Sequence, residues 1–73
     1  MQETKKLGNY IRKLREDKNL SLNSFSYKNG LEPSTLSRIE TGIIDPKYST
    51  LVKIAAGFDM KVSELLKNFE KLN

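Results

Sequence analysis

Apolar residues recur along the chain at spacings of three and four residues, which is the period of one face of an α-helix. In residues 4–18 they are Leu7, Ile11 and Leu14, and the outer face of this segment is basic. Two later segments repeat the spacing; their apolar residues are Leu51, Ile54, Ala55 and Phe58 in one, and Val62, Leu65, Leu66 and Phe69 in the other. No segment shows the sustained alternation of a β-strand. The pattern predicts an all-α fold.

A tight turn separates two shorter predicted helices in the middle of the chain. Ser21 is a good N-cap for the first of them, which covers about residues 22–29. Gly30 ends that helix and supplies the positive φ that a tight turn needs. The second begins at Pro33, where proline costs no hydrogen bond, and Gly42 stops it. This order indicates a helix-turn-helix; a plain helix pair in a bundle is the alternative.

The predicted helices, five in all, fit a single domain over residues 1–73. We expect its core to cover about residues 5–67. Residues 68–73 continue the last helix and are a candidate dimer contact.

The composition excludes several kinds of site. With no Cys and no His among 73 residues, the chain has no disulfide, no thiolate zinc site and no His base. The carboxylates form no metal set or catalytic pair, so we expect no enzymatic activity, no metal and no cofactor. No apolar run approaches the ~20 residues that span a bilayer, and we expect no signal peptide because no apolar stretch follows the charged residues at the start. We therefore expect a cytoplasmic protein without a membrane partner.

The charge is concentrated at the front of the chain. The formal net charge is +4 and the pI is about 9.5. Residues 1–28 hold seven Lys and Arg against three acids, whereas residues 29–73 hold six of each. A basic surface favours nucleic acid as a partner, with an anionic membrane surface second; solubility alone is the simpler interpretation.

Residues 20–42 resemble the helix-turn-helix of the lambda-repressor-like (Cro/repressor, xenobiotic-response-element) family, above all in the run Ser-Thr-Leu-Ser-Arg-Ile-Glu-Thr-Gly at residues 34–42. The continuation at residues 46–55 and 62–66 matches in order and spacing. The resemblance implies a five-helix domain that places its third helix in the major groove of double-stranded DNA. It also implies a transcriptional regulator that binds as a homodimer on a two-fold site, with no small-molecule ligand.

The resemblance assigns roles to positions in and around the recognition helix, about Pro33–Thr41. The base-reading candidates are Pro33, Ser34, Thr35, Ser37 and Arg38. Arg38 is the strongest because its guanidinium can bind guanine O6 and N7, although a phosphate contact is the alternative. The phosphate-binding candidates are Ser21, Lys28, Thr41, Gly42 and Lys47. For Thr35, contact with DNA and capping of its own helix remain open.

Two further expectations concern structure. The resemblance implies that Arg15 and Glu40 form an ion pair that neutralises a carboxylate near DNA; two unpaired surface charges are the alternative. The dimer candidates are Leu65, Leu66, Phe69 and Leu72, which otherwise would extend the core.

The chain also departs from the family pattern. Leu22 replaces a common Gln, Glu32 is a poor N-cap, and Ile43 and Ile44 replace polar loop residues. These departures favour the alternative function, a protein-interaction module of the same fold with weak or no DNA binding.

Overall fold

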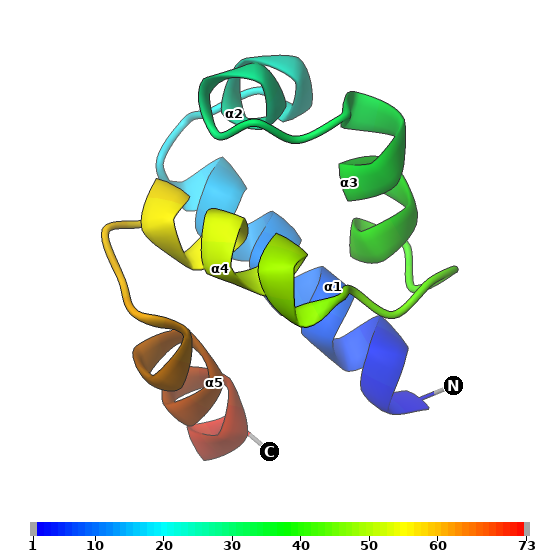
Figure 1. Ribbon diagram of the computed structural model, residues 1–73. Coiled ribbons are helices and arrows are strands. Elements are labelled where there is room, and N and C mark those ends of the chain that lie inside the picture. The colour runs from blue at the N-terminus through cyan, green and yellow to red at the C-terminus, as the bar shows by residue number, and fades with distance from the viewer. Residues whose placement is uncertain (1, 73) are drawn as a thin grey trace.

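The computed structural model describes residues 2–72 and contains five helices (Figure 1). They are α1 (Gln2–Asp17), α2 (Leu22–Lys28), α3 (Pro33–Glu40), α4 (Tyr48–Gly57) and α5 (Val62–Lys71). No strand occurs in the described part of the chain, so the predicted all-α fold is confirmed. The starts of α2 and α3 agree with the sequence pattern, whereas α1 begins two residues earlier than predicted. None of these helices is long and apolar enough to cross a membrane.

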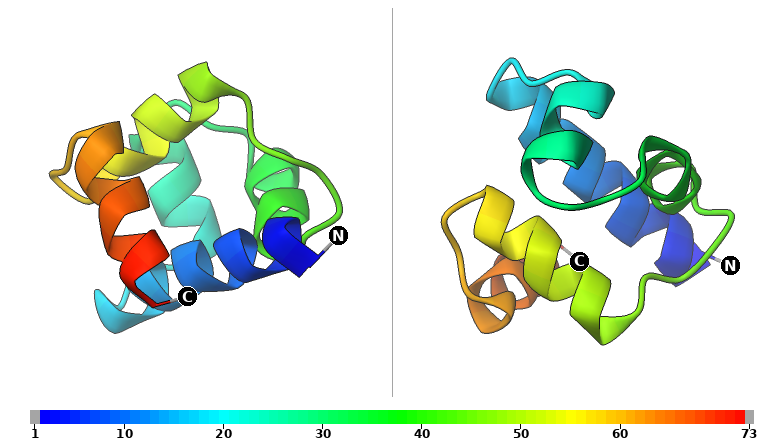
Figure 2. Two further views of the ribbon diagram at one scale, coloured as in Figure 1. Left: turned by 90° about the horizontal axis from the view of Figure 1, so that it is seen from below. Right: turned by 45° about the horizontal axis from the view of Figure 1, so that its top comes forward.

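The core forms where the predicted apolar faces meet. Ile11, Leu36, Ile54 and Leu65 are fully buried, one each from α1, α3, α4 and α5. From α2, Phe25 stacks on Phe58 with ring centroids 4.8 Å apart. Figure 2 shows the last turns of α5 beside α1, and there Phe69 packs on Tyr10 with ring centroids 5.5 Å apart. The whole domain measures 29 × 24 × 23 Å.

Gly8 sets the distance between α1 and α3. A Cβ built on this buried residue would lie 2.1 Å from the Ile39 carbonyl oxygen and 2.9 Å from the Glu40 carbonyl oxygen. The two helix backbones therefore approach each other more closely than any residue with a side chain allows. The sequence pattern gave no role to Gly8.

Two turns between helices adopt the left-handed conformation, which the sequence predicted for Gly30. Gly30, between α2 and α3, has a φ of +70°, and no other atom would contact a Cβ there within 4 Å. Asp59, between α4 and α5, has a φ of +58°, a conformation that aspartate tolerates better than most residues. Both turns reverse the chain within a few residues, which lets the short helices pack on one core.

Candidate nucleic-acid interface

α3 has a buried face and an accessible face. Leu36 and Ile39 are buried in the core, at 0% and 1% exposure. Ser34 and Arg38 are exposed on the other side. The remaining base-reading candidates, Pro33, Thr35 and Ser37, are half-buried. The structure therefore gathers the candidate residues on one helix, with the exposed Arg38 as the one cation among them.

A buried ion pair fixes the end of α3 to α1. Arg15 Nε donates to Glu40 Oε2 at 2.8 Å, and Arg15 Nη2 donates to Glu40 Oε1 at 3.0 Å. Arg15 Nη1 also donates to the Leu20 carbonyl oxygen at 2.7 Å. The hydrogen bond to Glu40 raises the pKa of Arg15 above its ordinary value, although burial acts in the opposite direction. The expected pair thus exists, and it compensates the only acid buried in α3.

Three of the phosphate candidates lie next to helix ends and have a hydrogen-bond donor available to a phosphate. Ser21 Oγ accepts a hydrogen bond from the Ser24 backbone N–H at 3.0 Å, so its own hydrogen stays available. Glu32 makes no side-chain hydrogen bond at the start of α3, as expected for a poor cap. Lys47 precedes α4 and is exposed, as is Lys28 at the end of α2.

The other two phosphate candidates have their donors engaged. The Thr41 hydroxyl donates to the Ser37 carbonyl oxygen at 2.9 Å. The Gly42 N–H donates to the Ile39 carbonyl oxygen at 3.1 Å. Because a phosphate accepts hydrogen bonds and donates none at neutral pH, neither group offers it a donor in this conformation. The geometry does not support the phosphate role that the sequence assigned to these two residues.

The isoleucines of the α3–α4 loop face different surroundings. Ile43 is 71% exposed, whereas Ile44 is 36% exposed and lines a small pocket with Thr35 and Thr50. Thr35 therefore lines this pocket between α3 and α4. Ile44 is thus partly covered by its neighbours, whereas Ile43 is largely available to a partner.

The dimer candidates on α5 are only partly available. Leu65 is completely buried in the core, which corrects its assignment to a dimer interface. Leu66 is half-buried, Phe69 is half-buried against Tyr10, and Leu72 is 72% exposed.

A second apolar surface, which the sequence pattern did not indicate, is the α4–α5 groove. It is lined by Tyr48, Val52, Ala56, Met60, Lys61, Val62 and Ser63.

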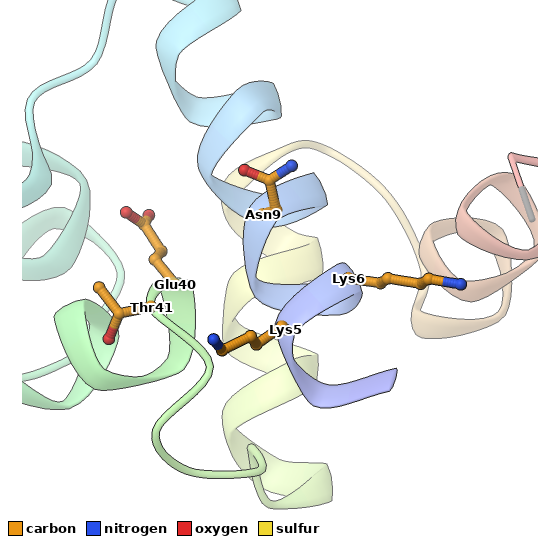
Figure 3. A pocket seen from close by; sticks show the side chains of 5 residues that line it. All are labelled: Lys5, Lys6, Asn9, Glu40 and Thr41. Carbon is orange, nitrogen blue, oxygen red and sulfur yellow. The ribbon is translucent and has the colours of Figure 1, made fainter. Parts of the chain in front are cut away.

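A hollow lies between the start of α1 and the end of α3. Lys5, Lys6, Asn9, Glu40 and Thr41 line it (Figure 3). From the sequence, the lysines of this helix had no specific contact and were noted only as part of its basic outer face. Helical periodicity could not reveal the hollow, because its two walls are more than 30 positions apart in the chain.

No group of His, Cys, Asp or Glu within residues 2–72 has an arrangement that could hold a metal ion.

Comparison with known proteins adds an independent line of information. A helix-turn-helix family model (HTH_3) matches residues 11–65. The control protein C.MunI of a Mycoplasma species is 37% identical over 67 residues, which is 90% of either chain. The crystal structure of the restriction-modification controller protein C.AhdI from Aeromonas hydrophila is similar, with a TM-score of 0.83 and 28% identity. That match covers 89% of this chain and 98% of C.AhdI.

A more distant structure shares the fold. The clp gene regulator ClgR from Corynebacterium glutamicum has a TM-score of 0.81 at 22% identity. The match covers 93% of this chain and 72% of ClgR. At this identity the similarity concerns the arrangement of the helices alone.

Proposed function

The chain belongs to the helix-turn-helix family of DNA-binding transcription regulators, and on that basis we propose that it recognises a specific double-stranded DNA sequence with α3 in the major groove. The observation that carries this proposal is the two-sided character of α3. Its inner face is anchored by Leu36 and Ile39, while Ser34 and Arg38 are accessible. A helix held in this way presents a rigid set of side chains to base edges.

In this proposal Arg38 is the main base-reading residue, because a guanidinium can bind guanine O6 and N7 together. Ser34 and Ser37 donate or accept and therefore discriminate weakly, and Pro33 offers only apolar contact, for example to a thymine methyl group. A reading face with one guanidinium predicts modest direct readout and a larger contribution from DNA shape. Ser21, Lys28 and Lys47 are the proposed phosphate contacts.

We further propose that the protein acts as a homodimer on a palindromic operator. Half-sites one helical turn apart are separated by about 34 Å. The longest dimension of the domain, 29 Å, is comparable to this separation, so two copies on adjacent half-sites would be neighbours on the DNA. A two-fold arrangement of this kind would place one α3 in each half-site.

The similarity to C.MunI and C.AhdI supports a more specific role. One is named a control protein and the other a restriction-modification controller protein, and each match covers about nine-tenths of this chain. We propose that this protein likewise controls the expression of restriction-modification genes. This role predicts an inverted repeat upstream of such genes, and upstream of the protein's own gene if it regulates itself.

The experiment that tests the proposal is a gel shift in two stages. Binding to mixed genomic DNA is measured first at about 50 mM salt, where phosphate contacts are strongest. A pool of random-sequence duplexes is then enriched by repeated binding, and the selected sequences are aligned. We expect one inverted repeat to emerge. Absence of any shift at low salt would support the protein-interaction module, for which the exposed Ile43 is the supporting feature.

A further inference from the structure

The side chain of Lys5 packs on the loop that follows α3. Gly42 has a φ of +79°, and a Cβ built on it would lie 2.5 Å from Lys5 Cγ and 2.9 Å from Lys5 Cα. The aliphatic stem of Lys5 therefore lies directly on the Gly42 backbone. The first turn of α1 is tied to the same loop again, because the Thr4 hydroxyl donates to the Asp45 carboxylate. These contacts fix the position of Lys5 relative to α3.

Lys5 and its neighbour Lys6 point in different directions. Both line the hollow between α1 and the end of α3, which has a volume of about 390 Å³. Figure 3 shows Lys5 extending toward Glu40 and Thr41, whereas Lys6 extends to the other side, toward α5. The two lysines carry the same charge on the same helix, but only Lys5 faces α3.

The ammonium group of Lys5 is not committed to a carboxylate. Within residues 2–72 the ion pairs are Arg12–Glu16 and Arg15–Glu40. Glu40 is the acid that lines the hollow, and both of its oxygens accept hydrogen bonds from Arg15. Asp45, in the adjoining loop, accepts from the Thr4 hydroxyl. The hollow therefore keeps a net positive charge that is available to an anion.

The hydrogen-bond donors at the C-terminal end of α3 are already engaged within the protein. The Thr41 hydroxyl donates to Ser37, the Gly42 N–H to Ile39, and the Ile43 N–H to the Arg38 carbonyl oxygen at 2.9 Å. The carbonyl end of a helix also carries partial negative charge, which repels a phosphate. An anion at this end of α3 thus requires a cation from another helix.

We propose that Lys5 binds a backbone phosphate of the DNA at the C-terminal end of α3. The proposal rests on the proposed DNA-binding function and deepens it, because it makes α1 part of the interface. Lys5 replaces the donors that Thr41 and Gly42 use within α3. Since its stem is fixed on Gly42, the contact restrains where the end of α3 lies along the DNA backbone. Lys6 contributes only to the general positive field.

A matched pair of variants separates these two roles. Lys5→Met keeps an aliphatic stem over Gly42 and removes the ammonium group, and Lys6→Met removes the same charge one residue later. Binding of each to a mixed-sequence DNA duplex is measured between about 50 and 200 mM salt. Each phosphate contact contributes about 0.9 to the slope of log K against log salt. We expect Lys5→Met to reduce the magnitude of this slope by about 0.9 per protomer. The same loss should lower the affinity for DNA about eightfold at ~0.1 M salt.

Lys6→Met is expected to leave the slope near the wild-type value. Phosphate ethylation interference on the selected operator provides a second measurement, because one interfering phosphate per half-site should be lost with Lys5→Met and kept with Lys6→Met. Circular dichroism establishes that both variants are folded. Equal slopes for the two variants, with normal wild-type binding, would overturn the role of Lys5 and leave the proposed function standing. No wild-type binding at low salt would overturn both.

Discussion

At the scale of single residues, Arg38 is the side chain on which sequence recognition is expected to depend. It is exposed on α3 and makes no ion pair within the described residues, so the guanidinium is free to bind a guanine edge. We expect Arg38→Met to weaken binding to the selected operator by about 1–3 kcal/mol and to relax the preference at one base pair per half-site. Fluorescence anisotropy with the operator and with single-base variants measures both effects. Lys67→Met, on the exposed surface of α5, is the control for loss of charge.

If Arg38→Met weakens binding to every sequence equally and lowers the salt dependence, the guanidinium contacts phosphate instead. Both roles follow from the chemistry of a guanidinium on an exposed helix face. What the structure adds is accessibility, since Arg38 points away from the core that holds Leu36 and Ile39.

The Arg15–Glu40 pair is a second residue-scale test, with stability as its readout. Both side chains are almost fully buried, with 10% and 3% exposure, and Glu40 is bound through both oxygens. Arg15→Met leaves a buried carboxylate without its partner, and we expect it to cost about 3–5 kcal/mol. Adding Glu40→Gln removes that charge and should recover part of the loss, which gives a coupling free energy of about 1–3 kcal/mol.

Urea denaturation of the wild type, the two single variants and the double variant completes the cycle. The exposed pair Arg12–Glu16 is the matched control; it should show a coupling of about 0.3–0.5 kcal/mol. A coupling near zero for Arg15 and Glu40 would mean that the pair does not hold α3 to α1.

At the scale of helices, the α1–α3 crossing depends on Gly8. Alanine normally favours a helix by about 1 kcal/mol over glycine. Here the added Cβ would meet the Ile39 and Glu40 carbonyl oxygens at 2.1 and 2.9 Å, so α3 must move away from α1. We therefore expect Gly8→Ala to destabilise the domain by about 1–3 kcal/mol and to weaken DNA binding as α3 shifts. Thermal unfolding followed by circular dichroism measures the first effect and a gel shift the second.

The neighbouring substitution Asn9→Ala serves as the control for helix propensity, because Asn9 is exposed on the same turn of α1. It should leave stability unchanged or raise it slightly. Should Gly8→Ala be as stable as Asn9→Ala, the close crossing would not be a requirement of the fold.

At the start of α3, in contrast, a substitution is expected to stabilise the domain. Glu32 occupies the N-cap with an extended backbone (φ −83°, ψ 132°), but its side chain makes no capping hydrogen bond. Serine suits this conformation, so Glu32→Ser should stabilise the domain by about 0.5–1 kcal/mol. It should also raise affinity for DNA, because a carboxylate near the phosphates is removed. Glu32→Gln separates the effects: it should raise DNA affinity without a comparable gain in urea stability.

The same helices indicate which features a sequence can predict. Ser21 and Gly30 were assigned correctly because a cap and a turn depend on residues only a few positions apart. Gly8 received no role because the Ile39 carbonyl oxygen that it approaches lies 31 positions away and has no signature in helical periodicity. Thr41 and Gly42 were assigned to phosphate because their positions match the family pattern, while only the loop geometry shows that their donors are engaged within the protein. The fold follows from local patterns, and the site depends on contacts between helices.

At the scale of the whole molecule, the remaining question is which surface meets a second copy. One candidate is the surface at the end of α5, which contains Tyr10, Phe69 and Leu72. It is flanked by Lys6 and Lys13, and in a two-fold dimer these lysines would lie close to the same lysines of the second copy. The α4–α5 groove is mostly apolar and has Lys61 as its only charged residue. Because like charges oppose association, the groove is the more favourable contact for the proposed homodimer. We therefore expect the dimer to form there, centred on Val52.

Val52 is 41% exposed, so Val52→Glu should leave the fold intact and place a charge in the centre of this contact. Sedimentation equilibrium at ~100 µM should show dimer for the wild type and monomer for Val52→Glu, with loss of cooperative binding to the operator. Leu72→Glu adds the same charge to the other surface, where we expect the dimer to persist. Dissociation by Leu72→Glu alone would move the interface to the end of α5, where the sequence first suggested it. A wild type that is monomeric in solution and binds the two half-sites independently would contradict the dimer altogether.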